Sequence, residues 1–117
     1  MQNILNFMQA ICAAEDIYLD SLPDLERLGG VAIKASDDIR AVVYSDKLTG
    51  WSQISTIAHE LGHHALGHFD DDAYLCKNIS DKNPEIERRE REAQIFAAAF
   101  TAFAMYDHYK ELGGVTL

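Results

Sequence analysis

The sequence predicts an α+β domain in which a short β-sheet packs on a central helix and a long helix forms the C-terminal side. Three segments, about residues 2–15, 52–66 and 84–112, carry apolar residues at helical spacing. Between the first two lie Val31–Ala35 and Ile39–Ser45, which are rich in β-branched residues and predict strands.

Length and composition favour one compact domain over residues 1–117. The chain is 48% hydrophobic and 25% charged, which suits a soluble domain with a single core. Cys12 and Cys76 are far apart and form no C-x-x-C pair, so neither a disulfide framework nor a cysteine zinc ribbon is indicated. The net charge of -9 opposes direct binding to nucleic acid and makes a basic protein the better expected partner.

The sequence predicts a cytoplasmic protein with no membrane association. No Lys or Arg precedes the first apolar residues, and no small-residue cleavage pattern follows them, so a secretory signal is not expected. The longest apolar stretch, Ile95–Met105, is interrupted by Thr101 and is too short to cross a bilayer.

The N-terminal part is expected to hold a helix and three strands. An amphipathic helix is predicted by apolar residues at helical spacing: Ile4, Leu5, Met8, Ile11 and Cys12. Asp16–Leu19 favours a short strand, and Ser21–Asp24 a turn that leads into a helical piece ending at Gly29 and Gly30. Ser36–Asp38 is a turn sequence, so the two runs around it predict a hairpin.

The central helix has two different faces. Ser52 is its expected N-cap and Gly67 its expected stop. One stripe is apolar and predicts the core face: Ile54, Ile57, Ala58, Leu61 and Ala65. His59 and His63 lie close together on roughly the opposite side.

Residues 59–63 read HELGH, the H-E-x-x-H pattern of a zinc site. Side chains four apart on a helix are neighbours, so His59 and His63 can bind one zinc ion. Glu60 flanks the metal without binding it, and is expected to act as general base, taking a proton from the attacking water and returning it to the leaving amine. His64 and His68 are also four apart but lack the glutamate, and are expected at the surface or behind the ligands.

A third zinc ligand is expected from the acidic start of the last helix, which begins at Asn83–Glu85 and is predicted to end at Leu112. Its candidates are Glu85, Glu87, Glu90 and Glu92. The inward stripe is marked by Ala93, Ala97, Phe100 and Ala104, and Glu90 continues this stripe whereas Glu92 faces elsewhere. Gln94, one turn after Glu90, can then hydrogen-bond a ligating histidine.

Two sequence blocks resemble the ImmA/IrrE-type zinc metallopeptidases of bacteria and their mobile elements. Residues 59–68 read HELGHHALGH, and residues 90–99 read EREAQIFAAA, similar to that family's E-x-E-A-(N/D)-x-F-A segment. The resemblance covers about residues 16–105 and implies a zincin-like α+β domain with a gluzincin-like site. It also implies the substrate class: transcriptional repressors, often helix-turn-helix proteins, cleaved as part of an anti-repressor function that derepresses mobile-element or stress genes. Gln94 departs from the family's usual Asn or Asp.

Several alternatives stay open on the sequence alone. The chain could be a zinc-binding regulatory module that binds a repressor without cutting it, although such a module does not need Glu60. A closed structural site with Cys76 or His68 as fourth ligand is a third possibility. An oxyanion-stabilising residue is also expected. The spacing of the candidates in the sequence does not select one of them: Tyr44, Tyr74, Tyr106, His108 and Tyr109. The substrate, its cleavage site, the oligomeric state and any need for an activating partner are also undetermined.

Overall fold

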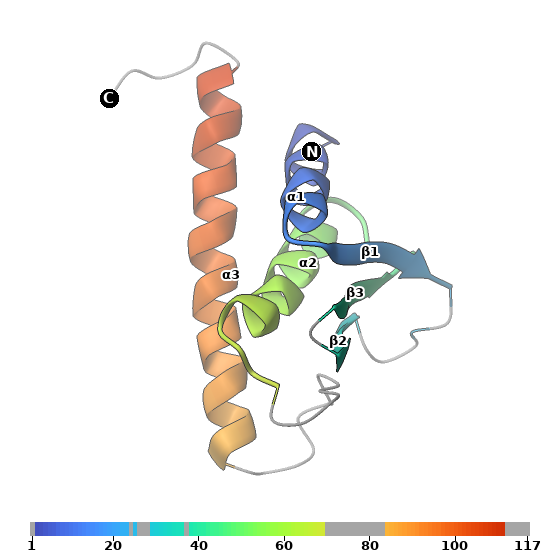
Figure 1. The fold of residues 1–117 in the computed structure, drawn as a ribbon. Helices are drawn as coiled ribbons and strands as arrows, with labels where there is room; N and C mark the ends of the chain where they lie inside the picture. Colours follow the sequence, from blue (N-terminus) through green and yellow to red (C-terminus); the bar gives the residue numbers. More distant parts are fainter. Residues whose placement is uncertain (1, 24, 26–28, 37, 70–83, 112–117) are drawn as a thin grey trace.

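The computed structural model describes residues 2–23, 25, 29–36, 38–69 and 84–111, and it confirms the α+β prediction (Figure 1). Its elements in chain order are α1 (Gln2–Ala14), β1 (Ile17–Leu22), β2 (Gly30–Ser36), β3 (Ile39–Ser45), α2 (Gly50–Ala65) and α3 (Pro84–Glu111). The central helix α2 contacts β2 and β3 on one side and α3 on the other.

The sheet has the order β1-β3-β2. β1 runs parallel to β3, while β2 and β3 form the predicted antiparallel hairpin, with a register shift between Lys34 and Ser36. The first strand differs from the prediction at both ends. It begins only after Asp16, because Asp16 has a φ of 56° and is not extended. It continues through Leu22, because β3 supplies hydrogen-bonding partners for the residues that were predicted to form a turn. The helical piece predicted before Gly29 lies mostly outside the described residues.

The core forms where α1, α2 and α3 meet the sheet. Its most buried members include Ile4, Met8 and Cys12 of α1, Val42 of β3, Ile54, Ile57, Ala58 and Leu61 of α2, and Ala97 and Ala104 of α3. The predicted core stripe of α2 is therefore confirmed except for Ala65, which is exposed. Ala65 borders an open pocket of about 410 Å³ together with residues of α1 and α3, and in the described part of the chain it stays exposed there.

The ends of α2 follow from its flanking residues. The helix begins earlier than predicted, since Thr49 is its N-cap and Ser52 lies inside the first turn, where its hydroxyl donates to the Thr49 carbonyl at 2.7 Å. The predicted stop is confirmed: Gly67 has a φ of 66°, which glycine adopts without steric cost. The chain turns back there, and the His68 backbone N–H donates to the His63 carbonyl at 3.0 Å.

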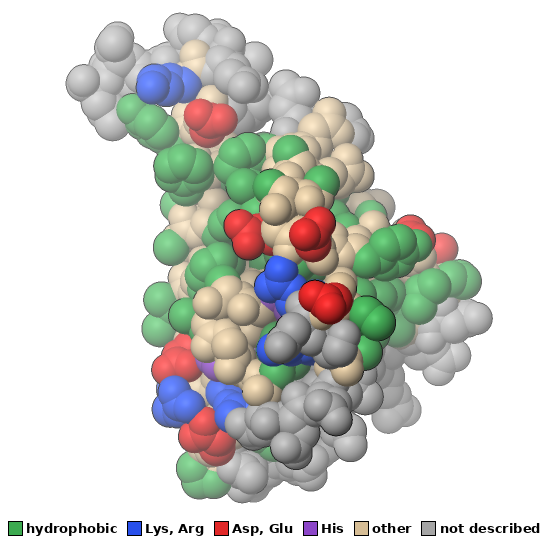
Figure 2. Space-filling view, in the orientation of Figure 1, with side chains coloured by type: hydrophobic (Ala, Val, Ile, Leu, Met, Phe, Trp, Pro, Cys, Tyr) green, Lys and Arg blue, Asp and Glu red, His purple; other side chains and the backbone are tan. Residues whose placement is uncertain are grey.

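The last helix begins at the predicted proline and carries acidic residues in its first turn. α3 runs along the whole length of the molecule in Figure 1, and its outer face keeps large apolar side chains exposed, among them Ile95, Phe103, Tyr106 and Tyr109. In Figure 2, hydrophobic side chains gather along the edge of the molecule that α3 forms. Among the described residues, no helix combines the length and apolar character that a membrane span requires.

Candidate metal centre

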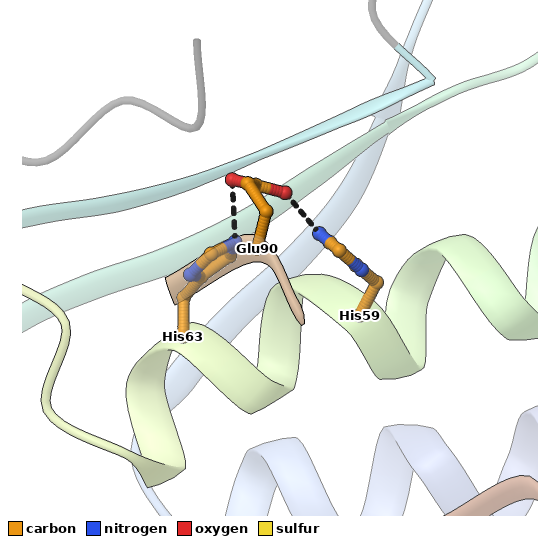
Figure 3. A group of neighbouring side chains, drawn as sticks. All are labelled: His59, His63 and Glu90. Atoms are coloured by element: carbon orange, nitrogen blue, oxygen red, sulfur yellow. Dashed lines mark hydrogen bonds and ion pairs between the residues drawn. The ribbon is translucent and has the colours of Figure 1, made fainter. Parts of the chain in front are cut away.

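Two histidines from α2 and one glutamate from α3 converge on one point (Figure 3). His59 Nε2 lies 2.8 Å from Glu90 Oε2, and His63 Nε2 lies 3.3 Å from Glu90 Oε1. One ligand atom from each residue can be chosen so that all three lie within 4.8 Å of one another. The structure therefore brings together the three residues that the sequence selected as ligands.

Local structure explains this convergence. The two histidines are one helical turn apart, so their rings lie on one face of α2, with centroids 5.0 Å apart. Glu90 reaches them because α3 crosses α2 closely at Gly62, where an added Cβ would lie 3.2 Å from the Ala93 Cα. The predicted inward stripe of α3 is confirmed at this crossing, since Ala93 and Ala97 are both buried.

Glu60 lies beside the three converging residues and is deeply buried, with 2% of its surface exposed. Its Oε1 is 3.9 Å from His63 Nε2, which is too long for a hydrogen bond. Gly30, the first residue of β2, packs against it, since a Cβ there would lie 3.1 Å from Glu60 Cγ. The carboxylate is thus held between the helix and the sheet.

The pKa values of the two histidines shift in opposite directions. Burial alone would lower the pKa of His59, but the neighbouring carboxylates of Glu90 and Glu60 outweigh it, and the net shift is upward. Burial dominates at His63, whose ring is completely buried, and its pKa is lowered despite the contact with Glu90. In the metal-free protein at neutral pH, His63 is therefore neutral and keeps a lone pair for a metal ion.

A glutamine holds the outer nitrogen of His59, as the sequence predicted. His59 Nδ1 lies 3.0 Å from Gln94 Oε1, so Nδ1–H donates and the amide oxygen accepts. The side chain is one methylene longer than the Asn or Asp usual at this position, and it still reaches the ring. This contact leaves Nε2 as the inward-facing atom of His59.

His64 and His68 were expected at the surface or behind the ligands; both are buried, so the first of these two positions is wrong. His64 Nε2–H donates to the Ala41 carbonyl at 2.8 Å, which ties α2 to β3, and burial lowers its pKa. His68 stands behind His63, with 3.0 Å between their Nδ1 atoms. A position behind a ligand was one of the two expected for His68. Its contact with α3 was not predicted: His68 Nε2 lies 2.8 Å from Glu92 Oε1.

Glu92 does face away from the three converging side chains, as predicted, and contacts His68 instead. The hydrogen bond from His68, together with the ion pair to Arg88, lowers the pKa of Glu92. Glu85 of the same acidic run pairs with Arg88 and Arg89. Of the four glutamates considered as ligands, only Glu90 belongs to the convergent group found among the described residues.

The donor set of His59, His63 and Glu90 fits a metal ion. Two imidazole nitrogens and one carboxylate are a common set of three protein ligands for catalytic zinc, which leaves one position open. The alternative of a closed site receives no support from His68, because both its ring nitrogens are engaged by His63 and Glu92. Cys76, the other proposed fourth ligand, lies outside the described residues.

The described structure does not select one of the candidates for oxyanion stabilisation. Tyr44 is buried in the hydrophobic core, and Tyr106 lies about 24 Å beyond Glu90 along α3 at 1.5 Å per residue. Tyr109 is one turn farther still and exposed. Tyr74 and the side chain of His108 are outside the described part of the chain.

Comparison with known proteins agrees with this geometry. The family model Peptidase_M78, described as the IrrE N-terminal-like domain, matches residues 16–101. The match spans most of the chain and includes every residue of the convergent group. No curated protein gives a significant match. The family points to peptidase activity, and the chain belongs to the IrrE N-terminal-like family of peptidases.

Proposed function

We propose that the chain is a zinc-dependent endopeptidase that cleaves a protein substrate. The proposed substrate is a helix-turn-helix repressor of a mobile element or stress response. The observation that carries the proposal is the convergence of His59, His63 and Glu90 next to a buried Glu60. A site that only holds a metal for stability has no need of a carboxylate in this position.

The proposed roles follow from the positions of the side chains. His59, His63 and Glu90 would hold the zinc ion, which when bound polarises the scissile carbonyl and makes water more acidic. Glu60 would take a proton from the attacking water on its carboxylate and deliver it to the leaving amine. Packing against Gly30 and the position beside His63 restrict the carboxylate to the region where the reaction would occur.

The sheet offers a way to hold the substrate. β2 is the outer strand of the described sheet on the side away from β1, and its first residue packs against Glu60. An extended peptide that adds to a sheet edge gains main-chain hydrogen bonds in a defined register. Such a peptide along β2 would pass the base, which supports cleavage of an extended segment of a protein.

The negative net charge of the chain supports a basic protein as the substrate. The chain has a formal net charge of -9, which favours association with basic proteins such as DNA-binding repressors. The family resemblance points to the same class. We propose that the encounter takes place in the cytoplasm, where such repressors act.

Substitution of Glu60 by glutamine tests the proposal. Glu60→Gln keeps the shape of the side chain and removes its basicity, so fold and zinc content should survive while cleavage falls by about a hundredfold to ten-thousandfold. The candidate repressor, identified from the adjacent gene, is co-expressed with wild type or variant, and its length is followed by mass spectrometry. Glu87→Gln, on the exposed face of α3, is the matched control and should cleave normally.

The outcomes separate the two classes of function. Cleavage with wild type and Glu87→Gln but not with Glu60→Gln supports the peptidase. A repressor that stays intact with all three proteins, yet is captured in a stable complex and releases its promoter, would show a regulatory module that binds without cutting.

A further inference from the structure

His68 is held more firmly than its position after a helix end requires. Its backbone N–H donates to the His63 carbonyl at 3.0 Å, and its carbonyl accepts from Arg89 Nη1 at 3.1 Å. Only 3% of the residue is exposed. The chain reversal at Gly67 and the buried Arg89 of α3 therefore hold the backbone of His68 at both its N–H and its carbonyl.

Both ring nitrogens of His68 are used. Nδ1 lies 3.0 Å from His63 Nδ1, and Nε2 lies 2.8 Å from Glu92 Oε1. Glu92 is itself positioned by Arg88, whose Nη1 donates to Oε2 at 2.8 Å. The result is a continuous chain of contacts from α3 through His68 to the outer nitrogen of His63.

The protons of this chain have one arrangement that leaves His63 Nε2 able to bind a metal ion. A carboxylate accepts hydrogen bonds and cannot donate, so His68 must carry its proton on Nε2, facing Glu92. In this arrangement His68 has a lone pair on Nδ1, and His63 bonds to it by donating from its own Nδ1–H. His63 is left with a lone pair on Nε2, the atom that faces Glu90.

We propose that His68 and Glu92 are positioning residues that hold His63 in the Nδ1–H form and aim its Nε2 at the metal. The proposal rests on the metal centre proposed above. Partners behind a ligating histidine fix its tautomer and ring orientation and raise its strength as a ligand. Here an imidazole stands between the ligand and the carboxylate.

The two ligating histidines are supported differently. His59 Nδ1 bonds to the neutral amide of Gln94, which is exposed on α3. His63 instead bonds to the buried ring of His68, which contacts the charged and half-buried carboxylate of Glu92. We therefore expect the loss of His68 to weaken zinc binding more than the loss of Gln94.

Two substitutions of His68 separate its hydrogen-bonding role from its packing role. His68→Phe keeps a ring of similar size but removes both nitrogens, and should weaken zinc binding by about 10- to 100-fold in competition with a chromophoric chelator. His68→Asn places an amide oxygen near the former Nδ1 and should recover most of the affinity. Gln94→Leu is the comparison at His59 and should cost less.

A second readout needs no metal. In ¹⁵N-histidine-labelled, metal-free wild type, long-range ¹H–¹⁵N correlations should show His63 protonated on Nδ1, and this form should no longer dominate in His68→Phe. Wild-type His63 protonated on Nε2 would overturn the proposal, as would unchanged zinc affinity in folded His68→Phe. If His63 shows the expected form but wild type binds no zinc, the metal centre is refuted while the hydrogen-bonded chain stands.

Discussion

Gly62 of α2 and Ala93 of α3 are in backbone contact: a Cβ on Gly62 would lie 3.2 Å from both the Cα and the carbonyl oxygen of Ala93. Glu90 is three residues before Ala93 on the same face of α3, and His63 directly follows Gly62. The spacing of the two helices at this contact therefore sets how far the carboxylate stands from the imidazoles.

Gly62→Ala should weaken metal binding without changing any ligand. Alanine favours a helix over glycine by about 1 kcal/mol, but the added methyl meets backbone atoms of Ala93 and the Phe96 ring at 3.1 Å, and overpacking of this kind costs about 1–3 kcal/mol. We expect α3 to move away from α2 and carry Glu90 with it. Zinc titration and thermal unfolding measure the two effects.

Ser55→Ala is the control, because Ser55 is an exposed residue of α2 and its substitution also changes helix propensity. Wild-type zinc affinity in Gly62→Ala would show that the helix spacing does not set the geometry of the centre.

Two adjacent glycines give a matched test of Glu60 as the proposed general base. A Cβ on Gly30 would lie 2.8 Å from Thr56 Cγ2 and 3.1 Å from Glu60 Cγ, whereas a Cβ on Gly29 meets nothing closer than 3.5 Å. Gly30→Ala should therefore displace Glu60 and lower kcat while zinc content stays at one per chain. Gly29→Ala should behave like wild type. Equal activity in the two variants would argue against a role for the position of Glu60.

Cys12 provides a pH-dependent test of the fold. Burial raises the pKa of its thiol from 9.0 to about 11, so the folded state keeps the proton at a pH where the unfolded chain has lost it. The contribution of the buried Cys12 thiol to the free energy of unfolding is fully present below pH 9 and is lost as the pH rises from 9 toward 11. In a Cys76→Ser background, denaturant melts of Cys12→Ala should show a shallower decline over this window. Rapid reaction of Cys12 with a thiol reagent at pH 8 would contradict its burial.

The sequence was sufficient for the main elements and for the convergence of the site, because both follow from periodicity. His59 and His63 share a helix face by their spacing, and Glu90 shares a face with Ala93, which is buried. The hairpin followed in the same way from β-branched runs around a turn. Each of these inferences needs only the geometry of one regular element.

Features that depend on the packing of one helix or strand against another were not predicted from the sequence. The contact of His68 with Glu92 needs both the chain reversal at Gly67 and the crossing of α3, and neither leaves a periodic pattern. Ala65 lies on the apolar stripe of α2 but borders an open pocket, because no residue of α1 or α3 fills the space opposite it. The first strand extended past its expected end because β3 supplied partners for Ser21 and Leu22.

Zinc stoichiometry in protein purified without a histidine tag tests the central claim most directly. Elemental analysis after zinc supplementation should give one zinc per chain for wild type and Glu60→Gln, none for His59→Ala or His63→Ala, and a strongly reduced content for Glu90→Ala. Glu87→Ala, in the exposed part of the acidic run, should keep full zinc. Wild-type protein that is folded but holds clearly less than one zinc, or a Glu90→Ala variant that holds as much as wild type, would contradict the proposed centre.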